Sequence, residues 1–221
     1  DGDLYYIVFD NQFDHTYSIV NRGLYENRVK CSKSVFNFQP VSVQDKSMYG
    51  LFEYPEFDRY NYNPILGIRD FAASKKLSQY NAQLGAMKQV HMLLLVYKDK
   101  PYDAALYQEA YWKGGNKNEF ILCVGIDSQM QTKWAKVISW TEVQDLKIKF
   151  ERKVREMPFN LTAIVDTMAK DVQCKFMRKH FKDFSYLTVE PTTGAVVISF
   201  IITLIVTIGV CIVVIKYDLF E

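Results

Sequence analysis

Val90-His91-Met92-Leu93-Leu94-Leu95-Val96 is the stretch that decides the fold of this chain. It is a continuous apolar run, short enough for one strand, and it ends at the polar Lys98-Asp99-Lys100-Pro101. Unbroken rather than alternating hydrophobicity is typical of a strand that is buried on both faces of a sheet. We therefore predict a central strand here.

A helix and a second buried strand follow this run. Asp103 is a candidate N-cap for a helix that Gly114-Gly115 would end, because glycine adopts the left-handed turn found at helix C-termini. Glu119 to Ile126, EFILCVGI, is again wholly apolar after its first residue. Strand, helix and strand of these lengths predict a right-handed βαβ unit with parallel pairing.

The flanking segments complete an α/β fold. Residues 133–140 predict a third strand, joined to the second by a hairpin, and 64–88 predict a helix before the first strand. A capping box that begins at Thr141 starts a helix ending at Pro158, and Asn160 caps the next one. The predicted class is α/β: a mixed sheet with a central parallel βαβ unit sandwiched by helices, plus a C-terminal transmembrane helix.

The stretch from Gly194 to Ile215 contains no charged residue. About 20 apolar residues cross the roughly 30 Å hydrocarbon core as a helix, so we predict a single-pass membrane protein whose first partner is the lipid bilayer. The predicted organisation is an aromatic-rich extension in 1–62 with short strands at 4–9 and 29–38, an α/β domain in 63–186, and the anchor with a short tail in 187–221. Cations mixed with aromatic residues just before the anchor suit a headgroup interface: Lys175, Arg178, Lys179 and Lys182.

Signals for orientation disagree. Cations are concentrated before the anchor and only Lys216 follows it, so the positive-inside rule places the domain in the cytoplasm or its equivalent. A first residue Asp1 instead of Met, as after removal of a leader, and the sequon Asn160-Leu161-Thr162 favour the opposite side. The sequence leaves the side of the soluble domain open.

Three carboxylates follow the predicted parallel strands: Asp99, Asp103 and Asp127. Ligands of α/β sheets gather at the carboxyl ends of the strands, and carboxylate oxygens suit a hard cation such as calcium. Helix capping by Asp103 and a turn at Asp127 are the structural alternatives, so no cofactor is expected beyond such a divalent cation. The near-neutral charge of +2 does not indicate a nucleic-acid partner, and no motif identifies a small-molecule substrate.

One turn resembles a known family. The sequence Tyr111-Trp112-Lys113-Gly114-Gly115-Asn116-Lys117-Asn118-Glu119, followed by an apolar strand, is similar to the glycine turn of TPM domains. The order of elements around it, from about Pro64 to Phe181, is similar too. TPM domains occur in thylakoid-lumen and photosystem-repair proteins, in modulators of nicotinic receptors and in bacterial membrane-anchored proteins. The resemblance implies metal binding or weak phosphatase activity in some members.

These observations favour an accessory or scaffolding subunit of a membrane protein complex, with integral membrane partners and without catalysis of its own. No nucleophile elbow, phosphate loop or zinc-protease helix occurs in the sequence. A metal-dependent phosphatase-like hydrolase of TPM type and a virus-encoded membrane protein are the alternatives.

Overall fold

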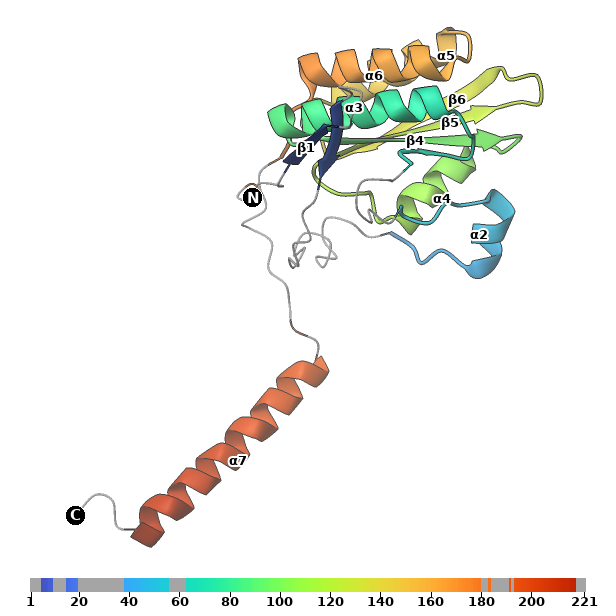
Figure 1. Ribbon diagram of the computed structural model, residues 1–221. Helices are drawn as coiled ribbons and strands as arrows, with labels where there is room; N and C mark the ends of the chain where they lie inside the picture. Colours follow the sequence, from blue (N-terminus) through green and yellow to red (C-terminus); the bar gives the residue numbers. More distant parts are fainter. Residues whose placement is uncertain are drawn as a thin grey trace.

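Residues 38–55 and 63–179, which we call the head, contain a mixed four-stranded sheet at their centre (Figure 1). The computed structural model describes residues 5–9, 15–19, 38–55, 63–179, 183, 191 and 193–217, with backbone paths only for the first two ranges. The strands follow the order β3 (Ile65–Leu66), β4 (His91–Lys98), β5 (Glu119–Ile126) and β6 (Thr132–Ser139). β3, β4 and β5 are parallel, and β5 and β6 form the antiparallel hairpin.

Helices cover both faces of this sheet, which confirms the predicted α/β class. α3 (Phe71–Lys88), α5 (Gln144–Glu156) and α6 (Leu161–Lys175) lie on one face, and α4 (Asp103–Tyr111) lies on the other (Figure 1). Alternate strand residues divide between two apolar clusters: Met92 and Leu94 face the three-helix side, whereas Leu93 and Leu95 face α4. Every one of these four side chains is 0% exposed, as the continuous apolar run predicts.

The two parallel crossovers have opposite hands. Both β3 to β4 and β4 to β5 step in the same direction across the sheet, yet α3 and α4 lie on opposite faces. Two right-handed crossovers that step in one direction would place their helices on the same face, so one of the pair is left-handed. Left-handed crossovers are rare, and here the arrangement includes the shortest strand, the two-residue β3.

Side chains protect the edges of the sheet. Because β3 covers only Leu94 and Leu95, the backbone of Met92 pairs with a buried side chain: Asn81 Oδ1 accepts from its N–H at 2.7 Å, and Asn81 Nδ2 donates to its C=O at 2.9 Å. On the opposite edge, Glu151 accepts the N–H of Val137 at 2.7 Å. Occupied edge groups prevent further strands from adding to the sheet.

The N-terminal part departs from the prediction of short strands and turns alone. β1 (Tyr5–Phe9) confirms the predicted strand at 4–9 and pairs with β2 (His15–Ile19), but 43–49 is a helix, α2 (Val43–Tyr49). Ser42 caps it, and Gly50 ends it at φ 65°. A seven-residue helix has too few turns to show a helical hydrophobic period in the sequence. The strand predicted from Val29 lies, apart from Phe38, outside the described residues.

Three helix starts were predicted at the wrong residue. The helix expected from Pro64 begins at Phe71 after β3, capped by Asp70, and Phe71 itself is 85% exposed. Asp103 is the first residue of α4 and not its cap, which is Tyr102. Thr141 does not cap α5 either, since its N-cap is Val143. Asn160 caps α6 as predicted, with Oδ1 accepting from Ala163 N at 2.9 Å.

The last element, α7 (Thr193–Tyr217), contains the predicted Gly194–Ile215 span. Its 25 residues make it the one helix of the described chain that is long and apolar enough to cross a membrane. No residue of this helix is buried against the rest of the protein. A helix so apolar and without protein cover needs an apolar environment from elsewhere.

Candidate functional site

A hollow of about 400 Å³ lies where α4 ends and β5 begins. It contains part of the turn that carries the family resemblance. Its lining combines aromatic, charged and amide side chains: Glu53, Tyr54, Tyr111, Trp112, Lys113 and Asn116. These residues come from two segments that are distant in sequence, 53–54 and 111–116.

The glycine turn shapes one side of the hollow. Lys113, Gly114 and Gly115 have φ of 51°, 77° and 71°, so three successive residues are left-handed. A Cβ at Gly115 would lie 2.9 Å from a carboxylate oxygen of Glu119, which leaves no room for a side chain. Trp140 Nε1 donates to the Gly114 carbonyl at 2.8 Å and holds the turn against the head. Glycine is therefore required here both for conformation and for space.

A buried carboxylate lies beneath the turn. Glu119, 2% exposed, accepts from Asn116 N at 2.8 Å and from Asn116 Nδ2 at 2.7 Å. Tyr54 OH also donates to it. A buried charge is stable only when hydrogen bonds replace its water, and these three donors do so. Glu119 thus ties the 53–54 segment to the glycine turn.

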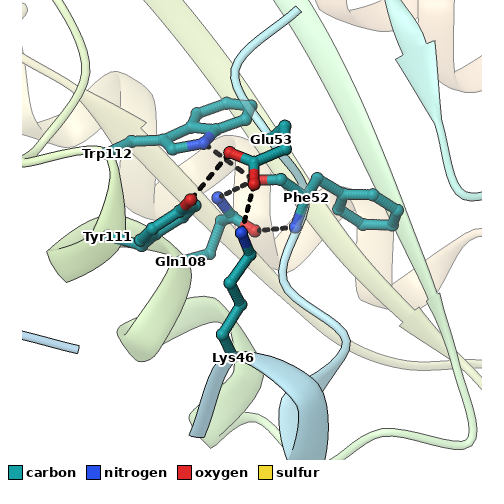
Figure 2. Close-up of polar contacts among 6 residues, drawn as sticks. All are labelled: Lys46, Phe52, Glu53, Gln108, Tyr111 and Trp112. Atoms are coloured by element: carbon teal, nitrogen blue, oxygen red, sulfur yellow. Dashed lines mark hydrogen bonds and ion pairs between the residues drawn. The ribbon is translucent and has the colours of Figure 1, made fainter. Parts of the chain in front are cut away.

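The opposite wall is held by the amide of Gln108, as Figure 2 shows. Gln108 is 0% exposed; its Oε1 accepts from Phe52 N at 2.8 Å and from Tyr97 OH at 2.7 Å. Its Nε2 donates to Phe52 O at 3.2 Å, and Trp112 Nε1 donates to the same carbonyl at 2.9 Å. One side-chain amide therefore pairs with both backbone polar groups of Phe52, as a neighbouring strand would.

Charged groups stand at the mouth. Glu53 forms an ion pair with Lys46 and accepts from Tyr111 OH at 2.7 Å (Figure 2). The bond from Lys46 and that from Tyr111 hold the pKa of Glu53 below its usual value, and the bond to Glu53 raises the pKa of Lys46. The Lys46 ammonium also lies 4.9 Å from the centre of the Tyr111 ring. The hollow offers ring faces, amides and paired charges, a set that suits noncovalent recognition of another chain.

The predicted carboxylate rim lies at the other end of the strands. The register pairs Lys98 with Ile126, and Asp99 N donates to the Ile126 carbonyl at 2.8 Å, so Asp99 and Asp127 follow neighbouring strand ends as predicted. Asp127 pairs with Lys133 at 2.8 Å and accepts from the amides of Gln129 and Gln131 at 3.0 and 2.8 Å. Its carboxylate therefore already has the cation and donors that a turn requires.

Asp99 is exposed at φ 51°, and Asp103 is exposed in the first turn of α4. Among the described residues, which include all three aspartates, no group of three or more Asp, Glu, His or Cys side chains comes close enough to share a metal ion. Calcium at this rim stays a prediction. It would need the side chains to move, with Lys133 displaced.

The predicted juxtamembrane cations divide into described and undescribed residues. Lys175 ends α6, and Arg178 and Lys179 follow it, partly exposed. Lys182 lies outside the described residues. The described three lie at the amino ends of β4 and β5, because Phe176 packs on Phe120 with ring centroids 6.5 Å apart.

Sequence reasoning did not single out Gln108, Glu53 or Lys46. A glutamine within the otherwise apolar face of a predicted helix is a signal that could have indicated Gln108, because a buried amide must find partners. Glu53 and Lys46 gave no such signal, since their partnership depends on how 38–55 folds back over α4.

No known protein family, no characterised protein and no solved structure matches this chain. The resemblance to TPM domains therefore stays a prediction from the glycine turn and the order of elements.

Proposed function

We propose that this protein is a single-pass membrane-anchored accessory or scaffolding subunit of a membrane protein complex. The observation that carries the proposal is α7, a 25-residue apolar helix of which no residue is buried against the rest of the described protein. Lipid or another membrane helix must surround it. The head supplies a surface for recognition, and the anchor keeps that surface at a membrane.

The anchor also has a face that suits another helix. Three residues with short side chains follow one another at a spacing of four along it: Ser199, Thr203 and Thr207. The hydroxyls of Thr203 and Thr207 donate to the carbonyls four residues earlier, both at 2.8 Å, so this face is smooth and has few free polar groups. Faces of this kind allow close helix packing in membranes.

The hollow favours the same reading. Glu119 begins β5 and lies beneath the hollow, and Phe120 packs on Phe176, after which the chain leaves the head. The hollow and the exit of the chain toward α7 are therefore at the same end of the strands. A membrane partner that binds α7 would have its own soluble part near this end.

Gentle detergent extraction of the full chain, followed by crosslinking and mass spectrometry, tests the proposal. A reproducible integral membrane partner is expected. Thr203→Leu should weaken its recovery more than Ile201→Leu on another side of α7, and Lys113→Glu at the hollow more than Lys98→Glu at the far end of β4. A chain that extracts alone, or that alkaline carbonate releases from membranes, would refute the proposal.

A metal-dependent phosphatase-like activity is the second candidate. It is favoured by the placement of Asp99 and Asp127 at adjacent ends of parallel strands. If it holds, calcium should bind the purified full chain and support phosphoester turnover, and the pair Asp99→Asn and Asp127→Asn should abolish both. An accessory subunit would keep its partner in this double variant.

A further inference from the structure

The point at which the chain leaves the head is fixed to the body of the fold. Phe176 is 2% exposed, and the next carbonyl, of Met177, accepts from Thr141 Oγ1 at 3.1 Å and from Glu142 N at 3.3 Å. The residues that follow α6 are thus held against the start of α5. Arg178 and Lys179 emerge from this fixed position.

The end of α3 meets the same place. Lys88 Nζ donates to the Phe176 carbonyl at 3.2 Å, which joins the last turn of α3 to the exit segment. Figure 1 shows the C-terminal ends of α3 and α6 at one side of the head. Two methionines are exposed here, Met87 at 62% and Met177 at 56%. Exposed flexible apolar side chains next to cations are typical of surfaces that enter the headgroup region of a bilayer.

The charge of this edge is strongly positive. The edge comprises Met87, Lys88, Lys175, Met177, Arg178 and Lys179, which we call the exit edge. The backbone N–H of Glu142 donates to the Met177 carbonyl of this edge. Lys147 of α5 lies close enough to Lys179 to sense its charge: burial is the largest cause that lowers the pKa of Lys147, Glu109 and Glu151 raise it, and Lys136 and Lys179 lower it. Cations kept together in this way attract a multivalent anionic surface.

We propose that the exit edge docks on an anionic lipid leaflet, the one from which α7 enters the membrane. The inference rests on the proposed membrane anchor. Residues 180–192, which connect the edge to α7, span about 45 Å even when fully extended, so the head stays within reach of the lipid surface. Docking is then an intramolecular step, favoured about fivefold by each cation that reaches the surface.

The head held in this way has a fixed orientation. The amino ends of β4 and β5, with the hollow, face the bilayer side, and the carboxyl ends, with Asp99 and Asp127, face away from it. Negative lipid is concentrated in the cytoplasmic leaflet, so docking also favours the cytoplasmic side for the head.

The exposed thiol of Cys174, beside Lys175 at the end of α6, provides a reporter. The full chain, with Cys31→Ser and Cys211→Ala and with Cys123 buried, is labelled there with a fluorophore and placed in nanodiscs. Headgroup spin-labelled lipid then quenches the fluorophore only when the exit edge is close. Discs of phosphatidylcholine alone are compared with discs containing about 30% phosphatidylserine.

Strong quenching is expected in the anionic discs, weak quenching in the neutral ones, and release by about 0.5 M salt. The variant Lys175→Gln, Arg178→Gln, Lys179→Gln should lower the ratio of docked to free head about 100-fold. The control Lys98→Gln, Lys100→Gln, Lys133→Gln removes as many charges near the other ends of the strands and should leave quenching intact. Equal quenching in both lipids, or equal loss in both variants, would overturn docking while leaving the anchor in place. A chain that fails to enter the discs would overturn the anchor itself.

Discussion

Replacing Gln108 by Leu should destabilise the head and release the wall of the hollow. The variant keeps the size of the side chain but removes the acceptor of two buried donors, Phe52 N at 2.8 Å and Tyr97 OH at 2.7 Å. Each buried donor left without a partner costs about 1–3 kcal/mol. The Phe52 carbonyl keeps the bond from Trp112 and adds little to the loss. We expect the free energy of unfolding to fall by about 2–6 kcal/mol, a large part of the stability of an ordinary domain.

Urea unfolding of the full chain in detergent, followed by tryptophan fluorescence, measures the loss. Hydrogen exchange locates it: the amide of Phe52 should exchange much faster, whereas amides in the centre of β5 should change only as far as global stability falls. Gln83→Leu is the matched control, because Gln83 is exposed on α3 and the same change there should shift stability by no more than about 0.5 kcal/mol. If Gln108→Leu unfolds at the control's midpoint, with Phe52 still protected, the assigned role of the amide is wrong.

Three further variants test other parts of the fold. Gly125→Ala should lower the melting temperature strongly, by an overpacking cost of about 1–3 kcal/mol or more, because a Cβ there lies 2.0 Å from the Trp134 ring; an unchanged melting temperature would contradict this packing. The bonds from Lys133 and nearby amides lower the pKa of Asp127 in the folded protein. The ionised Asp127 carboxylate therefore adds to the free energy of unfolding at a pH above the unfolded-state pKa of about 3.9, and this stabilisation is lost as the pH falls through the folded-state pKa. Urea midpoints of wild type and Asp127→Asn should therefore differ more at about pH 6 than at about pH 3, and a gap independent of pH would argue against the ion pair. Asn160→Ala should lower the free energy of unfolding in urea by about 1 kcal/mol through loss of the α6 cap, whereas Asn160→Asp can still cap the helix and should keep most of that stability. Equal losses of stability in the two variants would exclude capping as the cause.

Local signals predicted the elements of the sheet well. β5 occupies Glu119–Ile126 as predicted, and β4 lies within one or two residues of the predicted run. Both strands are buried on two faces, so each position had to be apolar and the pattern had only one reading. The starts of α3 and α5 were less legible, because a cap is decided by which side chain reaches a free backbone N–H and several residues compete for it.

The candidate site was only half visible in the sequence. The glycine turn could be recognised, since left-handed residues after a helix favour glycine. The residues that contact this turn could not be recognised from the sequence. Glu53 and Tyr54 reach the turn only because 38–55 folds over α4, and a contact across such a separation leaves no local pattern in either segment. At the carboxyl ends of β4 and β5, the positions of Asp99 and Asp127 were predicted from the sequence. The ion pair of Asp127 with Lys133 was not, because it depends on the geometry of the β5–β6 hairpin.

By itself, the sequence determined what each segment must be surrounded by. Runs of apolar residues specify burial, in a sheet for β4 and β5 and in a lipid-like medium for α7, because hydrophobicity belongs to the residues themselves. Only the tertiary structure decided which segments meet. It gave the two crossovers opposite hands, placed Gln108 in hydrogen-bonding distance of Phe52, and brought the cations of the exit edge together. Those outcomes depend on packing and hydrogen bonds between residues far apart in the chain, and such pairings exist only once the chain has folded.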